Sequence, residues 1–304
     1  MPPGRFIALF ACLWIYPASA APRVVTSIAP VHSLVSSVMQ GVSEPDLLVP
    51  PGASPHTFAL APSDMQALYA ADLIVWVGTP LERFLIKPLR ILEDPGARVT
   101  LAELPGVRLL KLRPGGKDNG GNFTPSRTPM GSDPHLWLDP RNARAIVTHV
   151  AKRLAMIDAA NAQRYQSNAQ GTLARLDALD ALIEQRLAPV KRLPFVVFHD
   201  AYQYFERRYG LNAAAVITSD PEVSPGARRI VGVRALIEAQ DVRCVFGEPQ
   251  FNPALVETVL EDTGARRGML DPEGADIAPG ADAYFVLMQR LADALTACLA
   301  KKAP

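Results

Sequence analysis

The sequence predicts an α/β protein with two lobes of mostly parallel β-sheet, joined by one long rigid helix. Short apolar runs alternate with helical patterns before residue 110, and the same alternation returns from residue 194 onward. Between these halves, residues 141–187 are rich in alanine and hold a single glycine, as expected of helix. The part over 162–187 would be about 39 Å long at ~1.5 Å per residue, enough to connect two lobes.

The first half contains strand-like and helix-like segments in turn. The run DLIVWVG is apolar throughout and bounded by turn residues, a pattern typical of a strand buried on both faces. Ser63 is placed to cap the N-terminus of the helix that precedes this run. Strands are predicted at 23–28, 46–50, 72–78 and 99–104, and helices at 30–40 and 63–71.

The second half repeats this pattern. The Ala-rich segment is expected to break near 158–161, and Pro189 and Pro194 end it because proline cannot continue a helix. Gly210 and Gly264 mark the ends of two later helices. Strands are predicted at 194–198, 213–218, 242–248 and 266–270, and helices at 201–210, 225–240, 252–264 and 281–300.

The predicted domains are an N-terminal lobe over 21–157, a linking helix over 158–189 and a C-terminal lobe over 190–304. Residues 111–134, within the first lobe, differ in kind because Gly, Pro, Asn, Ser and Thr dominate them. This composition predicts a mobile surface loop. Ligands bind beyond the carboxyl ends of parallel strands, so those strand ends are where a functional site is expected.

The first twenty residues form a segment of another kind. Arg5 precedes an apolar run from Phe6 to Tyr16, and the tripeptide ASA at 18–20 provides the small residues that a signal peptidase recognises. The interpretation is a cleaved signal peptide over 1–20, with a membrane anchor as the alternative. The run is too short to span a hydrocarbon core of ~30 Å, and no later segment is long and apolar enough to do so.

Charge and cysteine content narrow the class further. The chain has 31 Lys and Arg against 30 Asp and Glu, a balance that gives no reason to expect a nucleic acid or an anionic membrane surface as partner. Cys12 leaves with the signal, so the mature chain keeps Cys244 and Cys298. Two cysteines in an exported chain predict one disulfide, and two buried free thiols are the alternative.

Four candidate metal ligands follow strands or lie in adjoining loops. Of the five histidines, His56, His135 and His199 are expected in turns, and Asp271 comes directly after a predicted strand. The other two histidines, at 32 and 149, fall within predicted helices, where a structural or solvated role is expected. Three imidazoles with a carboxylate or water suit zinc, which prefers four ligands in a tetrahedron. The four positions are far apart in sequence, so spacing alone leaves scattered structural histidines as an alternative.

Several motifs together resemble one family along essentially the whole mature chain. They are GASPHTFALAPSD, DPHLWLDP, FVVFHDAYQYFERRYG, GEPQFNPALV and MLDPEG, in this order. These segments are similar to those of the metal-specific periplasmic binding proteins that feed ABC importers, in the zinc-uptake (ZnuA-like) branch. The resemblance implies two βα lobes with a metal in the cleft between them. It also implies a monomeric, non-enzymatic periplasmic protein that delivers Zn²⁺ to an inner-membrane ABC permease with its ATPase.

The resemblance also implies roles for particular residues. His56 and His135 would bind the metal from the N-terminal lobe, and His199 and Asp271 from the C-terminal lobe. The manganese branch of the family carries glutamate where His199 stands, so His199 favours zinc, because imidazole suits zinc and harder oxygen ligands suit manganese. The cysteines at 244 and 298 match a disulfide of the zinc branch.

Two departures from the family pattern affect the expected site. Many zinc-branch members carry a histidine-rich stretch before the His135 motif, whereas the segment 111–134 has no histidine. Some relatives have a glutamate just before the residue that matches His56, and Pro55 stands here instead. Proline cannot bind the metal, so Asp271 or water is expected in the fourth position.

Other assignments stay open at this point. Asp200, next to His199, is expected to cap the following helix, with support of the metal ligand as the alternative. Glu248 is expected in a surface salt bridge, with contact to the transporter or to a metal ligand as alternatives.

Rival functions are a manganese- or iron-binding protein of the same family, a zinc-binding adhesin or storage protein, and a zinc-dependent hydrolase of the HD type. The βα context of the His-Asp pair argues against the hydrolase, whose pair lies in an all-helical domain.

Overall fold

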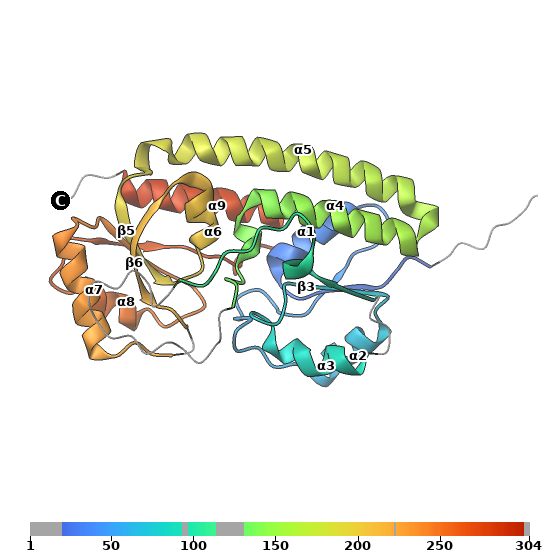
Figure 1. Cartoon of the computed structure of the whole chain (residues 1–304), viewed down its shortest axis with the longest axis horizontal. Coiled ribbons are helices and arrows are strands. Elements are labelled where there is room, and N and C mark those ends of the chain that lie inside the picture. Colours follow the sequence, from blue (N-terminus) through green and yellow to red (C-terminus); the bar gives the residue numbers. More distant parts are fainter. Residues whose placement is uncertain (1–19, 93–96, 114–130, 222, 301–304) are drawn as a thin grey trace, which may run out of the picture.

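The computed structural model describes residues 20–92, 97–113, 131–221 and 223–300 (Figure 1). The predicted signal peptide, apart from its last residue, and residues 114–130 of the predicted loop lie outside the described residues. The described chain forms two lobes, each built on a four-stranded parallel sheet with helices packed around it. The predicted fold class is confirmed.

The two sheets share the same strand order. It is β2-β1-β3-β4 in the N-terminal lobe and β6-β5-β7-β8 in the C-terminal lobe, and all neighbouring strands are parallel. Both sheets therefore place their carboxyl ends at one edge, as expected of βα units. The strands are β1 Val24–Thr26, β2 Asp46–Leu47, β3 Leu73–Trp76, β4 Arg98–Thr100, β5 Pro194–His199, β6 Asn212–Thr218, β7 Cys244–Gly247 and β8 Arg266–Met269.

The Ala-rich segment divides where the sequence predicts. After α4, a short 3₁₀ turn over Ala159–Asn161 leads into α5. The α-helices are α1 Ala29–Met39, α2 Pro62–Ala70, α3 Ile86–Ile91, α4 Pro140–Ile157, α5 Ala162–Leu187, α6 Gln203–Tyr209, α7 Ala227–Ala239, α8 Ala254–Leu260 and α9 Ala283–Leu299. None of these described helices is both long and apolar enough to cross a membrane.

Two helices connect the lobes. α5 runs along one side of the molecule over both sheets, and α9 lies beneath it (Figure 1). The start of α9 is tied to α1 of the N-terminal lobe, because the backbone N–H of Tyr284 donates to Ser33 Oγ and Ser37 Oγ donates to the carbonyl of Ala281. One cluster of buried apolar side chains extends through both lobes. The linkage therefore involves α9 as well as the long helix that the sequence predicts.

The predicted disulfide is present between Cys244 in β7 and Cys298 in α9. Cys244 lies in the middle of the C-terminal sheet and is fully buried. The disulfide therefore fastens the last helix to the sheet of the C-terminal lobe, and the free-thiol alternative is wrong.

Candidate metal centre

His56 lies in the loop that follows β2 in the N-terminal lobe. The chain turns at Gly52, whose φ of +86° is a conformation that favours glycine. The backbone N–H of His56 donates to Ser54 Oγ at 3.3 Å. The imidazole is partly exposed and makes no hydrogen bond to another described residue. The loop backbone and contacts with the rings of His135 and His199 therefore position this imidazole.

His135 immediately precedes a buried 3₁₀ turn, Leu136–Leu138, that leads into α4. The indole N–H of Trp137 in this turn donates to the carbonyl of Pro272 in the C-terminal lobe at 2.9 Å. Asp139 then caps α4, because its carboxylate accepts a backbone N–H of the first turn. These contacts fix the backbone directly after His135 and so help to position its side chain.

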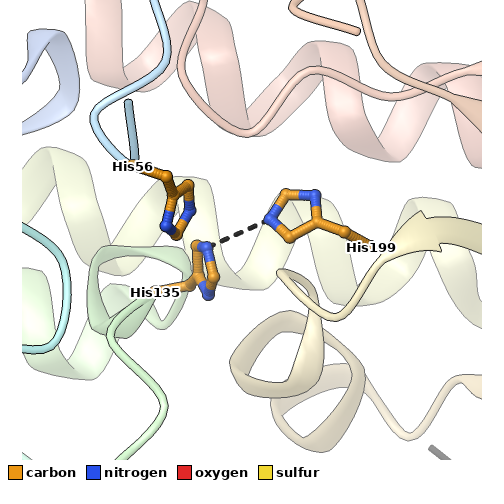
Figure 2. Close-up of side chains that lie close together, drawn as sticks. All are labelled: His56, His135 and His199. Carbon is orange, nitrogen blue, oxygen red and sulfur yellow. Dashed lines mark hydrogen bonds between the residues drawn. The ribbon is translucent and has the colours of Figure 1, made fainter. Parts of the chain in front are cut away.

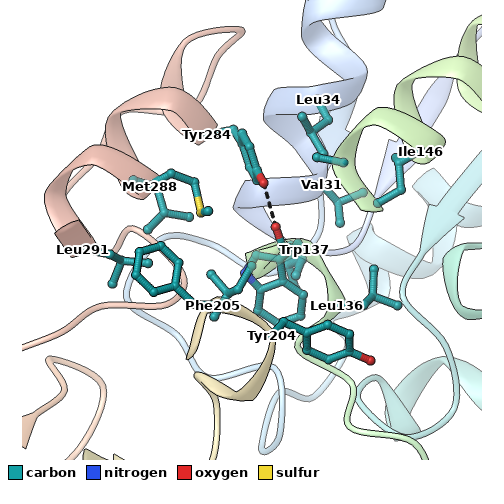
Figure 3. Close-up of a cluster of buried hydrophobic side chains, with 14 of the residues drawn as sticks. Val31, Leu34, Leu136, Trp137, Ile146, Tyr204, Phe205, Tyr284, Met288 and Leu291 are labelled. Atoms are coloured by element: carbon teal, nitrogen blue, oxygen red, sulfur yellow. Dashed lines mark hydrogen bonds between the residues drawn. The ribbon is translucent and has the colours of Figure 1, made fainter. Parts of the chain in front are cut away.

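The turn after His135 is also packed against the start of α9. Tyr284 of α9 donates its hydroxyl to the carbonyl of Trp137 at 2.7 Å, within a cluster of large buried side chains (Figure 3). The Trp137 ring lies 5.3 Å from the His135 ring, measured between centroids. The turn after His135 is thus seated in the shared core of the two lobes.

His199 is the last residue of β5, a central strand of the C-terminal sheet. It pairs with Thr218 at the end of β6, so its side chain is at the carboxyl edge of the sheet. Only 3 % of the residue is exposed. The prediction that His199 lies at a strand end is therefore confirmed.

The structure brings the three histidines together between the lobes (Figure 2). One ring nitrogen from each of His56, His135 and His199 lies within 4.8 Å of the others, the one such group of metal-ligating side chains among the described residues. The ring centroids are 5.1 to 5.7 Å apart. Residues from three distant parts of the chain thus offer a converging set of imidazole nitrogens.

Two of these nitrogens are already spaced as zinc requires. Nε2 of His135 and Nε2 of His199 are 3.3 Å apart. Zinc–nitrogen bonds of about 2.05 Å at a tetrahedral angle place two ligand atoms about 3.3 to 3.4 Å apart. The same separation permits a hydrogen bond between the rings, whose proton zinc would displace.

A buried carboxylate faces the other ring nitrogen of each of these two histidines. Nδ1 of His135 is 2.9 Å from Asp133 Oδ1, and Nδ1 of His199 is 2.7 Å from Glu248 Oε1. A carboxylate at Nδ1 keeps the proton on that atom, which leaves the Nε2 lone pair for a metal. The expectation of a surface salt bridge for Glu248 is wrong, because Glu248 is only 4 % exposed and contacts His199.

Charge and burial act differently on the three rings. Burial and the two other histidines lower the pKa of His56 well below 6.5. Burial and His199 likewise lower the pKa of His135. Burial also acts to lower the pKa of His199, but the charge and hydrogen bond of Glu248 outweigh it, so this pKa is raised. Burial raises the pKa of Asp133 to about 7, against the hydrogen bonds from His135 and Gln203.

Asp271 lies outside the three-histidine group. Its Oδ1 accepts from Gln250 Nε2 and from the backbone N–H groups of Glu273 and Gly274, while Oδ2 accepts from the N–H of Ala275. The carboxylate thus organises the turn after β8. Its role as a metal ligand stays a prediction.

The expectation that Asp200 caps the next helix is wrong. α6 begins only at Gln203, with Tyr202 at its N-cap and no side-chain cap. The carboxylate of Asp200 instead binds the guanidinium of Arg113. Sequence reasoning paired Asp200 with the nearest backbone, whereas its partner lies 87 residues away.

The remaining two histidines have structural contacts, as expected. His32 is buried in α1 with Nε2 3.0 Å from the carbonyl of Pro45. His149 is in α4 with Nδ1 2.9 Å from the carbonyl of Ala145. Neither belongs to the metal-ligating group.

Comparison with known proteins agrees with this arrangement. The family model described as "ZnuA: Zinc-uptake complex component A periplasmic" matches residues 24–298, which is nearly all of the described chain. The chain belongs to the ZnuA family.

Individual ZnuA-family relatives cover the chain almost completely. The high-affinity zinc uptake system protein ZnuA of Brucella suis biovar 1 is 41% identical, over 91% of this chain and 92% of the relative. A crystal structure of ZnuA is similar with a TM-score of 0.76 and 27% identity, covering 90% of this chain and 99% of the other.

The fold of the ZnuA family is not limited to zinc complexes. The SBP FpvC from Pseudomonas aeruginosa, solved in complex with Mn²⁺, has a TM-score of 0.77 at 24% identity and covers 92% of this chain and 99% of its own. The fold alone therefore does not select the metal, and the ligand atoms must.

Proposed function

We propose that this chain is a periplasmic zinc-binding protein that captures Zn²⁺ and delivers it to an ABC permease for uptake. The observation that carries the proposal is the group of three imidazoles, two of them buried, with ligand atoms within 4.8 Å of one another. Three nitrogen ligands match the preference of zinc and leave one tetrahedral position to fill. An all-imidazole set is a poor match for manganese, which favours oxygen ligands.

In this proposal His56, His135 and His199 bind the zinc, and Asp271 or water completes the tetrahedron. Asp271 Oδ2 accepts one backbone hydrogen bond, from Ala275, so a lone pair on this oxygen is available to a metal. A turn movement at the end of β8 would bring it to the ion. Asp271→Asn would weaken zinc binding if the carboxylate is a ligand and leave it unchanged if water is.

The remaining parts of the proposal follow from family membership. The ZnuA family is periplasmic by description, which supports export through the predicted signal peptide over residues 1–20. The partner is an inner-membrane ABC permease with its ATPase. Zn²⁺ is cargo in this role, and we propose that the protein acts as a monomer and catalyses no reaction.

The test is metal content and competition in the purified protein. Zn²⁺ is expected to displace Mn²⁺ and Fe²⁺ in competition titrations. Structural zinc sites bind with about 10–16 kcal/mol, so one of four ligands contributes about 2.5–4 kcal/mol, and His199→Ala should weaken zinc binding about 70- to 900-fold.

His149→Ala is the matched control, because this histidine lies in α4 outside the group and its loss should leave zinc affinity unchanged. Unchanged zinc affinity in His199→Ala, or a preference for Mn²⁺, would overturn the proposal.

A further inference from the structure

The two described ends of the predicted loop pack against the C-terminal lobe. Lys111 forms an antiparallel bridge with Ser132, and the N–H of Asp133 donates to the carbonyl of Leu110 at 2.7 Å. Residues 110–113 and 131–133 therefore form a short paired stalk. One arm of this stalk continues directly to His135.

Arg113 of this stalk binds two buried carboxylates of the other lobe. Its Nε is 2.9 Å from both carboxylate oxygens of Asp200, and its Nη2 also binds Asp200. Nη1 donates to Glu206 Oε2 at 2.9 Å and Nη2 to Glu206 Oε1 at 3.1 Å. All three guanidinium nitrogens are used, which is the paired geometry that arginine forms with carboxylates.

The two carboxylates depend on this cation. Asp200 and Glu206 are only 8 % and 6 % exposed. Two buried negative charges repel each other and lose hydration, so they require a compensating cation. Asp200 immediately follows His199. Any movement of Asp200 with Arg113 therefore shifts the end of β5, where His199 lies.

Further hydrogen bonds reinforce the same junction. Gln203 donates to the carbonyl of Lys111 and to Asp133 Oδ2, each at 3.1 Å. The hydroxyl of Tyr204 donates to the carbonyl of Asp133 and accepts the N–H of Leu110. The stalk that leads to one ligand is thus fastened to the start of α6, which follows the other ligand.

We propose that Arg113 is a clasp between the lobes, a positioning residue that holds His135 and His199 at the separation zinc requires before the metal arrives. The clasp ties Asp200, which is adjacent to His199, to the stalk. The stalk carries Asp133 and leads to His135. This inference rests on the proposed zinc-binding function. The ion pair of Arg113 does not bind the metal, but it fixes the positions of the ligand side chains before binding.

The test combines zinc affinity with the distance between lobes in the metal-free protein. Arg113→Leu is expected to weaken zinc binding at least about tenfold, the range found when a group that supports a metal ligand is lost. Spin labels on unnatural amino acids at Tyr69 in α2 and Val231 in α7, both exposed, leave the disulfide intact. The distance distribution should broaden in metal-free Arg113→Leu and narrow again when Zn²⁺ is added.

The matched control is Arg208→Leu in α6, the helix that also holds Glu206. Arg208 pairs with Asp180 of α5 and, like Arg113, is mostly buried, but this pair does not join the stalk to α6. The control is expected to lower thermal stability and to leave zinc affinity and the distance distribution unchanged. Should Arg113→Leu fail to fold, Glu206→Gln removes part of the clasp and is expected to show a smaller change of the same sign.

The outcomes separate the clasp from the zinc function itself. Wild-type protein that does not bind zinc would overturn the proposed function. Wild-type binding with an unchanged affinity in Arg113→Leu, or a weaker affinity with an unchanged distance distribution, would overturn the clasp alone. Equal effects of Arg113→Leu and Arg208→Leu on zinc affinity would mean that Arg113 contributes only to overall stability. This result would also overturn the clasp.

Discussion

The two lobes share a strand order but use their buried glutamates differently. In each sheet the first strand in sequence lies between the second and the third. A buried glutamate comes after the third strand in both lobes: Glu82 after β3 and Glu248 after β7. The topology is therefore the same, and only the partners of the two carboxylates differ.

In the N-terminal lobe the buried glutamate, Glu82, accepts hydrogen bonds from backbone N–H groups. Glu82 accepts the N–H of Val77 at 2.9 Å and the N–H of Gly78 at 2.8 Å. The neighbouring strand β1 ends in Thr26, whose hydroxyl donates to the carbonyl of Asp46. These contacts of Glu82 and Thr26 lie within the N-terminal lobe.

In the C-terminal lobe the end of the first strand carries a candidate metal ligand. β5 ends in His199, and Glu248 binds its Nδ1 instead of a backbone N–H. Each lobe thus has a buried glutamate after its third strand, but Glu82 accepts backbone N–H groups of the segment after β3, whereas Glu248 contacts the side chain at the end of β5. Function thus depends on side chains placed on a repeated architecture.

The largest effect is expected from removing the disulfide that strengthens the C-terminal lobe. Cys244 and Cys298 are 54 residues apart in sequence. A loop of this length gives a stabilisation of about 4 kcal/mol in the chain-entropy model. The double variant Cys244→Ala with Cys298→Ala should lower the free energy of unfolding of the metal-free protein by this amount in urea denaturation. An unchanged midpoint and slope would mean that this lobe is stable without its covalent link.

Glu82→Gln tests the structural glutamate through pH. Burial raises the pKa of Glu82 from 4.5 to about 7, so the folded state retains a proton that the unfolded state releases between these values. The free energy of unfolding of the wild type should therefore fall as pH rises through this window, by at most about 3 kcal/mol. Glutamine cannot ionise, so the fall should be smaller in the variant than in the wild type when both are unfolded in urea at pH 5 and pH 8.

The pH test has its own control. Glu257→Gln changes an exposed glutamate paired with Arg267 and should follow the wild-type pH dependence. Parallel curves for wild type and Glu82→Gln would show that Glu82 ionises in the folded protein without cost.

Glu248→Leu tests the functional glutamate and should give the smallest free-energy change of the three. Loss of a carboxylate that orients a metal-bound histidine typically costs about 10–100-fold in metal affinity. Zinc affinity should fall in this range by competition with a fluorescent chelator. Glu82→Gln, which alters the buried glutamate after the third strand of the other lobe, should leave zinc affinity unchanged. Equal zinc affinities in all three proteins would contradict the contrast between the lobes.

Local patterns predicted most of the elements. The break between α4 and α5 near residue 158 and the strand before His199 follow from propensity and apolar periodicity, which neighbouring residues determine. The predicted strand over 99–104 is shorter, because β4 ends at Thr100 and a 3₁₀ turn follows. Local signals identify an element more reliably than its last residue.

The partners of the charged residues could not be predicted in this way. Glu248 faces His199 because β7 lies beside β5 in the sheet, and strand order is a long-range property. A clue was available, since Glu248 follows a predicted strand of the same lobe and such strand ends meet at one edge. No comparable clue linked Arg113 to Asp200, because their contact crosses between the lobes.

The sequence by itself determined the two βα lobes, the helix between them and the residue types that can hold zinc. Each of these depends on composition, periodicity or motif within a short segment. Tertiary structure alone decided that His135 and His199 lie 3.3 Å apart at Nε2, that buried carboxylates orient both rings, and that α9 joins α5 across the lobes. These features are distances between segments far apart in the chain, and such distances exist only once both lobes have packed on their shared core.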